Sequence, residues 1–320
     1  MIIKNAKIVL SLILVLAISA CGGGASESSD SKDASDNGSA NGSNSSSGTG
    51  TSTGIGELEQ IVDFESANFG PRNIDVWLPD GYEQDSDKQY RVMYVHDGQF
   101  LFRAGDCDCF NTVVRLNVAM QQLITEGKIE DTIVVGIWNG GAASYRMLDF
   151  YPENALNLMP EVERNDVVDA AGGEFYANEY LTYLVDDVMP MIESNYRVKT
   201  GPENTSVMGF SMSGVMAIYT MVEYPDVFGS VAAISPWWVD EYAVKYFEGK
   251  LPSPETHRIY LDMGNEGFEQ ELDWFNSYIE EAGYLDGESY LYKEFVNDDH
   301  NPFDWGLRIH FSLEFLHSKS

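Results

Sequence analysis

Short apolar runs alternate with segments of helical periodicity along most of the chain after residue 55. Runs rich in β-branched residues predict buried strands, and apolar residues spaced three and four apart predict helices. The predicted strands are 60–69, 73–78, 91–96, 132–137, 205–209, 230–234, 258–263 and 290–295. The predicted helices are 112–125, 181–192, 214–223, 268–282 and 303–317. Strands that alternate with amphipathic helices predict an α/β fold, with a mostly parallel central sheet and helices on both faces.

The N-terminal residues do not fit this pattern. Residues 1–20 combine two lysines with an apolar stretch over 8–18, which is typical of a signal peptide and too short to span a membrane. The letters ISAC at 18–21 resemble a bacterial lipobox and predict cleavage before Cys21, with lipid on its sulfur. The alternative is an ordinary signal peptide with an incidental cysteine. Because residue 22 is not aspartate, we expect an exported lipoprotein at the outer membrane or cell surface, facing the periplasm or the exterior.

The segment that follows is almost entirely small and polar. Residues 21–54 consist mainly of Gly, Ser, Ala, Asn, Thr and Asp, so they have no apolar face to bury. This composition predicts a flexible tether between the lipidated cysteine and the rest of the chain. We therefore expect a signal peptide over 1–20, a lipidated tether over 21–54 and a catalytic domain over 55–320.

The charge of the chain argues against two classes of binding partner. Among 320 residues, the formal net charge is −32. A surface this acidic argues against binding to nucleic acid or to an anionic membrane, so membrane contact is expected through Cys21 alone. Cys107 and Cys109 are separated by one residue, which strains a disulfide, and no second ligand cluster accompanies them to indicate a metal. No phosphate-binding glycine loop follows the first strands, so no cofactor is implied.

The letters GFSMSG at 209–214 follow a predicted strand and precede a predicted helix. This order is typical of a nucleophile elbow, a sharp turn whose serine stands at the apex and whose flanking residues must be small. Ser211 has Gly209 and Ser213 two residues to either side. Ser213 has the β-branched Val215 on one side, which would crowd the turn. Ser211 is therefore the predicted nucleophile.

In hydrolases with this elbow, the partners follow in the order serine, acid, histidine. Of the five histidines, only His300 lies in a loop directly after the last predicted strand, so it is the predicted general base. His310 and His317 are expected on a solvated face of the last helix. Glu266, just past the strand 258–263, is the predicted acid. The alternatives are Asp262, Glu269 and a dyad that lacks an acid.

Acyl transfer also needs donors for the developing oxyanion. The elbow supplies the backbone N–H of Met212. The turn after the strand 91–96 reads HDGQ, and Gly98 lets it present the N–H of Gln99. Both amides are predicted to form the oxyanion hole.

These motifs together resemble the esterase D-like, or putative esterase, branch of the α/β-hydrolases. The similarity runs through YVHDGQFLF, VVGIWNGGAASYRMLDFYP, GFSMSG, SPWW, YLDMG and HNPFDWGLRIHFSLEFL, from about residue 91 to residue 316. It implies an α/β-hydrolase fold, with Ser211 as nucleophile, His300 as base, and Gln99 and Met212 as oxyanion donors. In the family the acid commonly stands three residues after the strand-ending glycine. Here that position is Gly267, and Glu266 stands one residue earlier.

Further residues are expected near the pocket. Arg146 either pairs with Asp149 as a structural strut or faces an anionic or sugar substrate. Of Trp237 and Trp238, one is expected in the core and the other as an aromatic wall for substrate. The polar segment 154–171 lacks clear periodicity and is interpreted as a lid.

The sequence thus predicts an exported, lipid-anchored serine carboxylic-ester hydrolase acting on a small-molecule or carbohydrate-linked ester. An acyltransferase of the same family is the first alternative. A non-catalytic surface binding protein on a hydrolase fold is the second.

Overall fold

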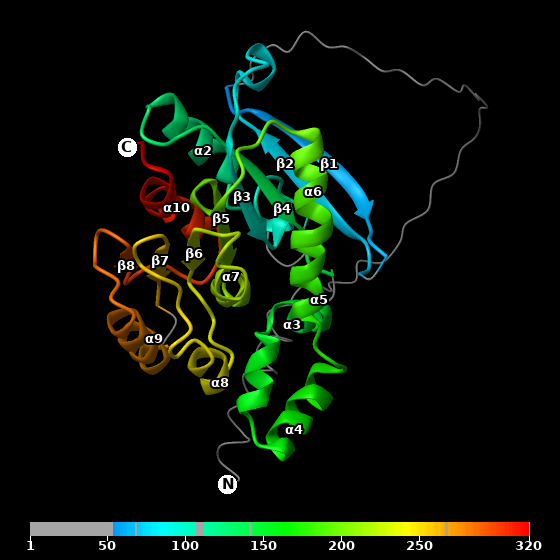
Figure 1. The fold of residues 1–320 in the computed structure, drawn as a ribbon, viewed down its shortest axis with the longest axis vertical. Coiled ribbons are helices and arrows are strands. Elements are labelled where there is room, and N and C mark those ends of the chain that lie inside the picture. The colour runs from blue at the N-terminus through cyan, green and yellow to red at the C-terminus, as the bar shows by residue number, and fades with distance from the viewer. Residues whose placement is uncertain (1–53, 68, 107–111, 141–142, 266–267, 320) are drawn as a thin grey trace, which may run out of the picture.

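A single eight-stranded sheet forms the centre of the molecule (Figure 1). The computed structural model describes residues 54–67, 69–106, 112–140, 143–265 and 268–319. The strands are β1 (Glu57–Phe64), β2 (Arg72–Leu78), β3 (Arg91–His96), β4 (Thr132–Ile137), β5 (Thr205–Phe210), β6 (Ser230–Ile234), β7 (Arg258–Met263) and β8 (Tyr290–Glu294). Their order is β1-β2-β4-β3-β5-β6-β7-β8. Strand β2 runs antiparallel to both of its neighbours, β1 and β4. The six strands β3 to β8 are parallel to one another. The predicted α/β architecture is confirmed.

Helices cover both faces of the sheet, as strands buried on both sides require. The helices are α2 (Leu116–Thr125), α3 (Ala143–Phe150), α4 (Glu161–Ala171), α5 (Ala177–Thr182), α6 (Met189–Asn195), α7 (Met212–Glu223), α8 (Glu241–Lys245), α9 (Glu269–Glu281) and α10 (Pro302–His317). A π-helical segment, Tyr183–Val188, joins α5 to α6. Alternate residues of each strand enter two separate apolar clusters. One cluster includes residues of α2 and α10, and the other includes residues of the remaining helices.

One predicted helix has a different start in the structure, and one segment without a predicted helix contains one. The helix predicted over 112–125 begins at Leu116, because Arg115 is left-handed at a φ of 58° and interrupts helical backbone before it. The polar segment 154–171, which showed no clear periodicity, is helical: it contains a short 3-10 helix, Glu153–Leu158, followed by α4. Its helix was missed because α4 buries only Val167 and Ala171 and therefore lacks a clear apolar stripe.

The N-terminal predictions concern residues that the structure does not describe. The signal peptide, Cys21 and nearly all of the tether lie outside the described residues. Within the described ranges, no helix combines the length and the apolar character needed to cross a bilayer. The domain boundaries therefore remain predictions.

Candidate active site

Ser211 stands at the turn between β5 and α7. Its φ of 59° and ψ of −127° lie in a region that residues other than glycine rarely adopt. The next residue, Met212, begins α7. Ser211 is buried, but 5% of the residue's surface remains accessible. This strained strand-to-helix turn is the geometry that the GFSMSG motif predicts.

Gly209 is required by the close approach of the chain on the other side of the turn. A Cβ atom at Gly209 would lie 1.9 Å from the carbonyl oxygen of Ser213. Because that contact is with backbone, a larger residue could be accommodated only if the elbow opened.

This contact leads to a prediction for stability. We expect Gly209→Ala to lower the free energy of unfolding by about 3 kcal/mol and to impair the site, measured by urea unfolding. The matched control is Gly173→Ala, since a Cβ there would meet only the Leu148 side chain at 3.9 Å. Wild-type stability in Gly209→Ala would contradict the described turn.

Ser213 has a structural role in the elbow. It is fully buried, and its hydroxyl donates to the carbonyl oxygen of Phe210 at 2.8 Å and accepts from the Phe210 N–H at 2.9 Å. These two bonds satisfy backbone groups at the end of β5. A serine in place of the usual second glycine therefore braces the turn, while Ser211 occupies the apex.

The HDGQ turn lies beside the elbow, since β3 and β5 are neighbouring parallel strands. Asp97 is left-handed, with a φ of 63°, and leads into a short 3-10 helix, Gly98–Phe100. A Cβ at Gly98 would lie 2.5 Å from the backbone of Gly136, so only glycine fits against β4 there. The N–H groups of Gln99 and Met212 both occupy first-turn positions, which have no acceptor within their own helix.

His300 lies in the loop between β8 and α10, directly before the N-terminus of α10. Asn301 caps that helix by accepting from the N–H groups of Phe303 and Asp304. The His300 ring packs edge-on against Trp305, with ring centroids 5.1 Å apart. Trp305 in turn stacks on Phe210 at 5.4 Å. These ring contacts link His300 to the residue directly before Ser211.

The predicted acid, Glu266, lies outside the described residues, as does the side chain of Glu269. The alternative Asp262 is fully buried and committed to other partners. Its carboxylate accepts from Arg308 at 3.1 Å, from the Ser235 N–H at 3.1 Å and from the Tyr260 hydroxyl at 3.1 Å. Burial raises the pKa of Asp262 to about 6, against the opposing effect of Arg308. Asp262 thus connects the ends of β6 and β7 to Arg308 in the middle of α10.

Arg146 is a strut, but its predicted partner was wrong. Its guanidinium binds both carboxylate oxygens of Asp97, with Nη2 2.6 Å from Oδ2, and also donates to the carbonyl oxygen of Phe210 at 3.2 Å. Asp149 pairs instead with Arg72 at 2.9 Å. Asp97 was predicted only as part of the HDGQ turn, and its role as the partner of Arg146 was not predicted.

The two adjacent tryptophans have different surroundings. Trp238 is 1% exposed and packs against Phe247 and Phe275 in the core. The backbone N–H of Trp237 donates to the carbonyl oxygen of Ser211 at 3.0 Å, and its ring is 6.5 Å from that of Phe268. Trp237 therefore lies at the elbow, but it is only 7% exposed and belongs to the same apolar cluster as Trp238, so both tryptophans are core residues.

Two other histidines, His96 and His317, are fully buried. His96 is fully buried between the hydroxyls of Tyr180 and Thr220, and burial lowers its pKa to about 4. His317 was predicted on a solvated face, and this was wrong. It is fully buried beside Ser206, and burial lowers its pKa to about 3. The last helix packs its C-terminal end against the sheet, which removes His317 from solvent.

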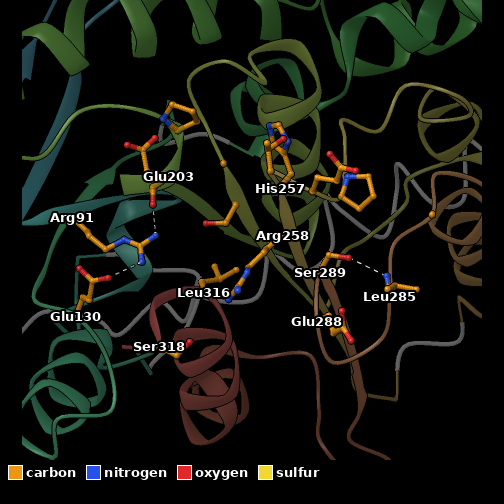
Figure 2. A pocket seen from close by; sticks show the side chains of 17 residues that line it. Arg91, Glu130, Glu203, His257, Arg258, Leu285, Glu288, Ser289, Leu316 and Ser318 are labelled. Carbon is orange, nitrogen blue, oxygen red and sulfur yellow. Dashed lines mark hydrogen bonds and ion pairs between the residues drawn. The ribbon is translucent and has the colours of Figure 1, made fainter. Parts of the chain in front are cut away.

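A polar cavity of about 620 Å³ lies at the N-terminal ends of the parallel strands, whereas the elbow lies at their C-terminal ends (Figure 2). It is lined by Arg91, Ser230 and Arg258, the first residues of β3, β6 and β7, whereas Ser211 follows the last residue of β5. Arg91 is already bound by the side chain of Glu130 and the carbonyl oxygen of Glu203. This cavity is separate from the elbow. Among the described residues, no three His, Cys, Asp or Glu side chains gather as a metal site.

Known proteins share this architecture. The family model described as "Putative esterase" matches residues 67–298, more than half of the chain. YbbA, an uncharacterized protein of Bacillus subtilis, is 26% identical over 200 residues, covering 62% of this chain and 69% of YbbA.

Two solved structures illustrate the shared fold. A ferulic acid esterase has a TM-score of 0.60 at 18% identity, covering 82% of this chain and 98% of that one. The enterobactin esterase of Shigella flexneri has a TM-score of 0.60 at 13% identity, covering 83% of this chain and 62% of that one. The family match spans the HDGQ turn and the elbow, so the predicted resemblance is confirmed. The chain belongs to the putative esterase family and is a carboxylic ester hydrolase with an α/β-hydrolase fold.

Proposed function

We propose that this esterase works through an acyl-enzyme formed on Ser211. The observation that carries the proposal is the backbone of Ser211, held at a φ of 59° and a ψ of −127° at the start of α7. A non-glycine residue remains in such a conformation only where its surroundings hold it there, and such strain gathers at functional sites. The neighbouring HDGQ turn, on the adjacent strand, supplies the second half of an oxyanion hole.

In the proposed reaction, His300 accepts the proton of the Ser211 hydroxyl as Oγ attacks the ester carbonyl carbon. The carbonyl oxygen becomes an oxyanion that accepts from the N–H groups of Gln99 and Met212. Collapse of this intermediate breaks the ester bond, and His300 donates the proton to the leaving alcohol. Water, deprotonated by His300, then attacks the acyl-enzyme and regenerates the serine.

Glu266 is proposed to hold the His300 imidazole in the required tautomer. The N–H of Asn265, the residue before Glu266, donates to the carbonyl oxygen of Asp298, two residues before His300, at 3.2 Å. This bond brings the acid loop and the histidine loop side by side. Asp262 is a poor alternative because its carboxylate is already bound by Arg308.

For the substrate, we propose an ester of an aromatic acid carried by a small molecule or a carbohydrate. Solved structures with this fold include a ferulic acid esterase and an enterobactin esterase. The half-buried Phe268, whose ring lies 6.5 Å from that of Trp237 beside the elbow, is proposed as the aromatic surface for such an acyl group.

Rapid mixing with a p-nitrophenyl ester tests the acyl-enzyme. We expect a burst of about one p-nitrophenol per active site and an acyl group on the peptide that contains Ser211. Turnover without any acylated peptide would contradict the mechanism. Added alcohols separate hydrolysis from the alternative acyltransferase, because a transferase would form the new ester in preference to the free acid.

We further propose that the protein is exported and anchored by lipid on Cys21, since the ISAC motif follows a signal-like apolar stretch. Cys21→Ala is expected to move the protein from the membrane fraction to the soluble fraction and to abolish labelling by radioactive palmitate. Cys107→Ala is the matched control and should stay with the membrane. Unchanged membrane association of Cys21→Ala would contradict the anchor.

A further inference from the structure

Arg146 connects the two turns that flank the proposed point of attack. Its Nε atom lies 3.1 and 3.0 Å from the two carboxylate oxygens of Asp97, and its Nη2 atom lies 2.6 Å from Oδ2. The same Nη2 donates to the carbonyl oxygen of Phe210 at 3.2 Å. Asp97 begins the turn that carries the Gln99 N–H, and Phe210 directly precedes Ser211. One guanidinium therefore spans both halves of the oxyanion hole.

Both turns contain a residue at positive φ, Asp97 at 63° and Ser211 at 59°. Such backbone relaxes unless side chains around it hold it in place. Asp97 is held on two sides, because Asn139 also donates to its carboxylate at 2.7 Å. The planar guanidinium fixes direction as well as distance, which a single ammonium group cannot do.

We propose that Arg146 is a positioning residue that sets the placement of the Gln99 N–H relative to Ser211 Oγ. This inference rests on the serine mechanism proposed above. The carboxylate of Asp97 already neutralises Arg146, so Arg146 is poorly suited to receive an anionic group of the substrate. Because an oxyanion hole acts on charge that develops in the transition state, loss of this alignment lowers kcat and leaves KM nearly unchanged.

The chain offers a matched control in Arg72. Arg72 pairs with the buried Asp149 of α3, the helix that also carries Arg146, at 2.9 Å. The side chains of Arg72 and Arg146 are similarly covered, at 10% and 16% exposed, and both aspartates are fully buried. Arg72 is not bonded to the elbow. Its loss therefore reproduces the cost of breaking a buried pair without moving the oxyanion hole.

The experiment compares Arg146→Gln, Arg146→Lys and Arg72→Gln in the full-length protein. We would measure kcat and KM with uncharged p-nitrophenyl acetate and with anionic p-nitrophenyl hemisuccinate, together with the melting temperature of each variant. For Arg146→Gln, kcat is expected to fall by about 10- to 1000-fold on both esters, with KM within about threefold of wild type. Arg146→Lys should recover only part of that loss. Arg72→Gln should lose a similar amount of thermal stability but keep kcat within about threefold.

Three results would overturn the inference. A rise in KM confined to the anionic ester would make Arg146 a substrate-binding residue. Unchanged kcat in a folded Arg146 variant would remove its positioning role. An equal loss of kcat in Arg72→Gln would show general destabilisation. If Arg146→Gln does not fold, Arg146→Lys and Asp97→Asn provide the same comparison. Failure of wild-type Ser211 to acylate would instead contradict the proposed function itself.

Discussion

Ser211→Ala is expected to lower kcat by about 10⁴- to 10⁶-fold while leaving the protein folded. Alanine retains the backbone of the elbow but has no oxygen with which to form an acyl-enzyme. The residual rate would come from water attacking a substrate whose carbonyl is still polarised by the Gln99 and Met212 N–H groups. Steady-state hydrolysis of a p-nitrophenyl ester, with the melting temperature as a fold check, measures this effect.

Ser213→Ala is the matched control for this substitution. Its hydroxyl bonds the backbone of Phe210, so its loss should lower stability by about 1–2 kcal/mol. The elbow would lose a brace but keep its nucleophile, and kcat should remain within about tenfold of wild type. The reverse ranking, with Ser213→Ala inactive and Ser211→Ala active, would exchange the roles of the two serines.

His300→Ala is expected to lower kcat by about 10³- to 10⁶-fold, because the serine hydroxyl would lose the base that accepts its proton. Residues that act as a unit are not additive, so Ser211→Ala/His300→Ala should be no slower than Ser211→Ala alone. Single and double variants assayed on the same ester measure this coupling.

The control for His300→Ala is His310→Ala. His310 lies on α10 and packs against Phe311, ten residues from the predicted base. Its removal should leave kcat within about threefold. The double variant has its own contradicting outcome. If kcat of Ser211→Ala/His300→Ala fell by the product of the two single-variant losses, Ser211 and His300 would not act in the same step.

The buried strands were the most predictable part of the fold. The bounds of β3, β4, β6 and β7 agree with the predictions, because the strands lie within the sheet and their apolar residues have no other place to pack. Helix α4 was missed for the opposite reason: it lies at the periphery and buries few of its residues. Local apolar patterns therefore predicted the strands of the central sheet better than the peripheral segment 154–171.

The elbow and the turn were predictable because their constraints are local. Gly98 and Gly209 meet backbone so closely that only glycine fits, and this restriction is visible as a motif. The partner of Arg146 was not predictable, because Asp97 lies 49 residues away and Asp149, three residues away, offered an equally plausible carboxylate. That choice depends on where the fold places Arg146, between Asp97 after β3 and Phe210 at the end of β5.

The role of Ser211 as nucleophile is tested most directly by labelling the purified protein with a fluorophosphonate probe and identifying the modified peptide by mass spectrometry. We expect one adduct, on Ser211, whose formation is strongly slowed by His300→Ala and little affected by His310→Ala. An adduct on Ser213, or a folded wild-type sample that takes up no probe, would contradict Ser211 as the nucleophile.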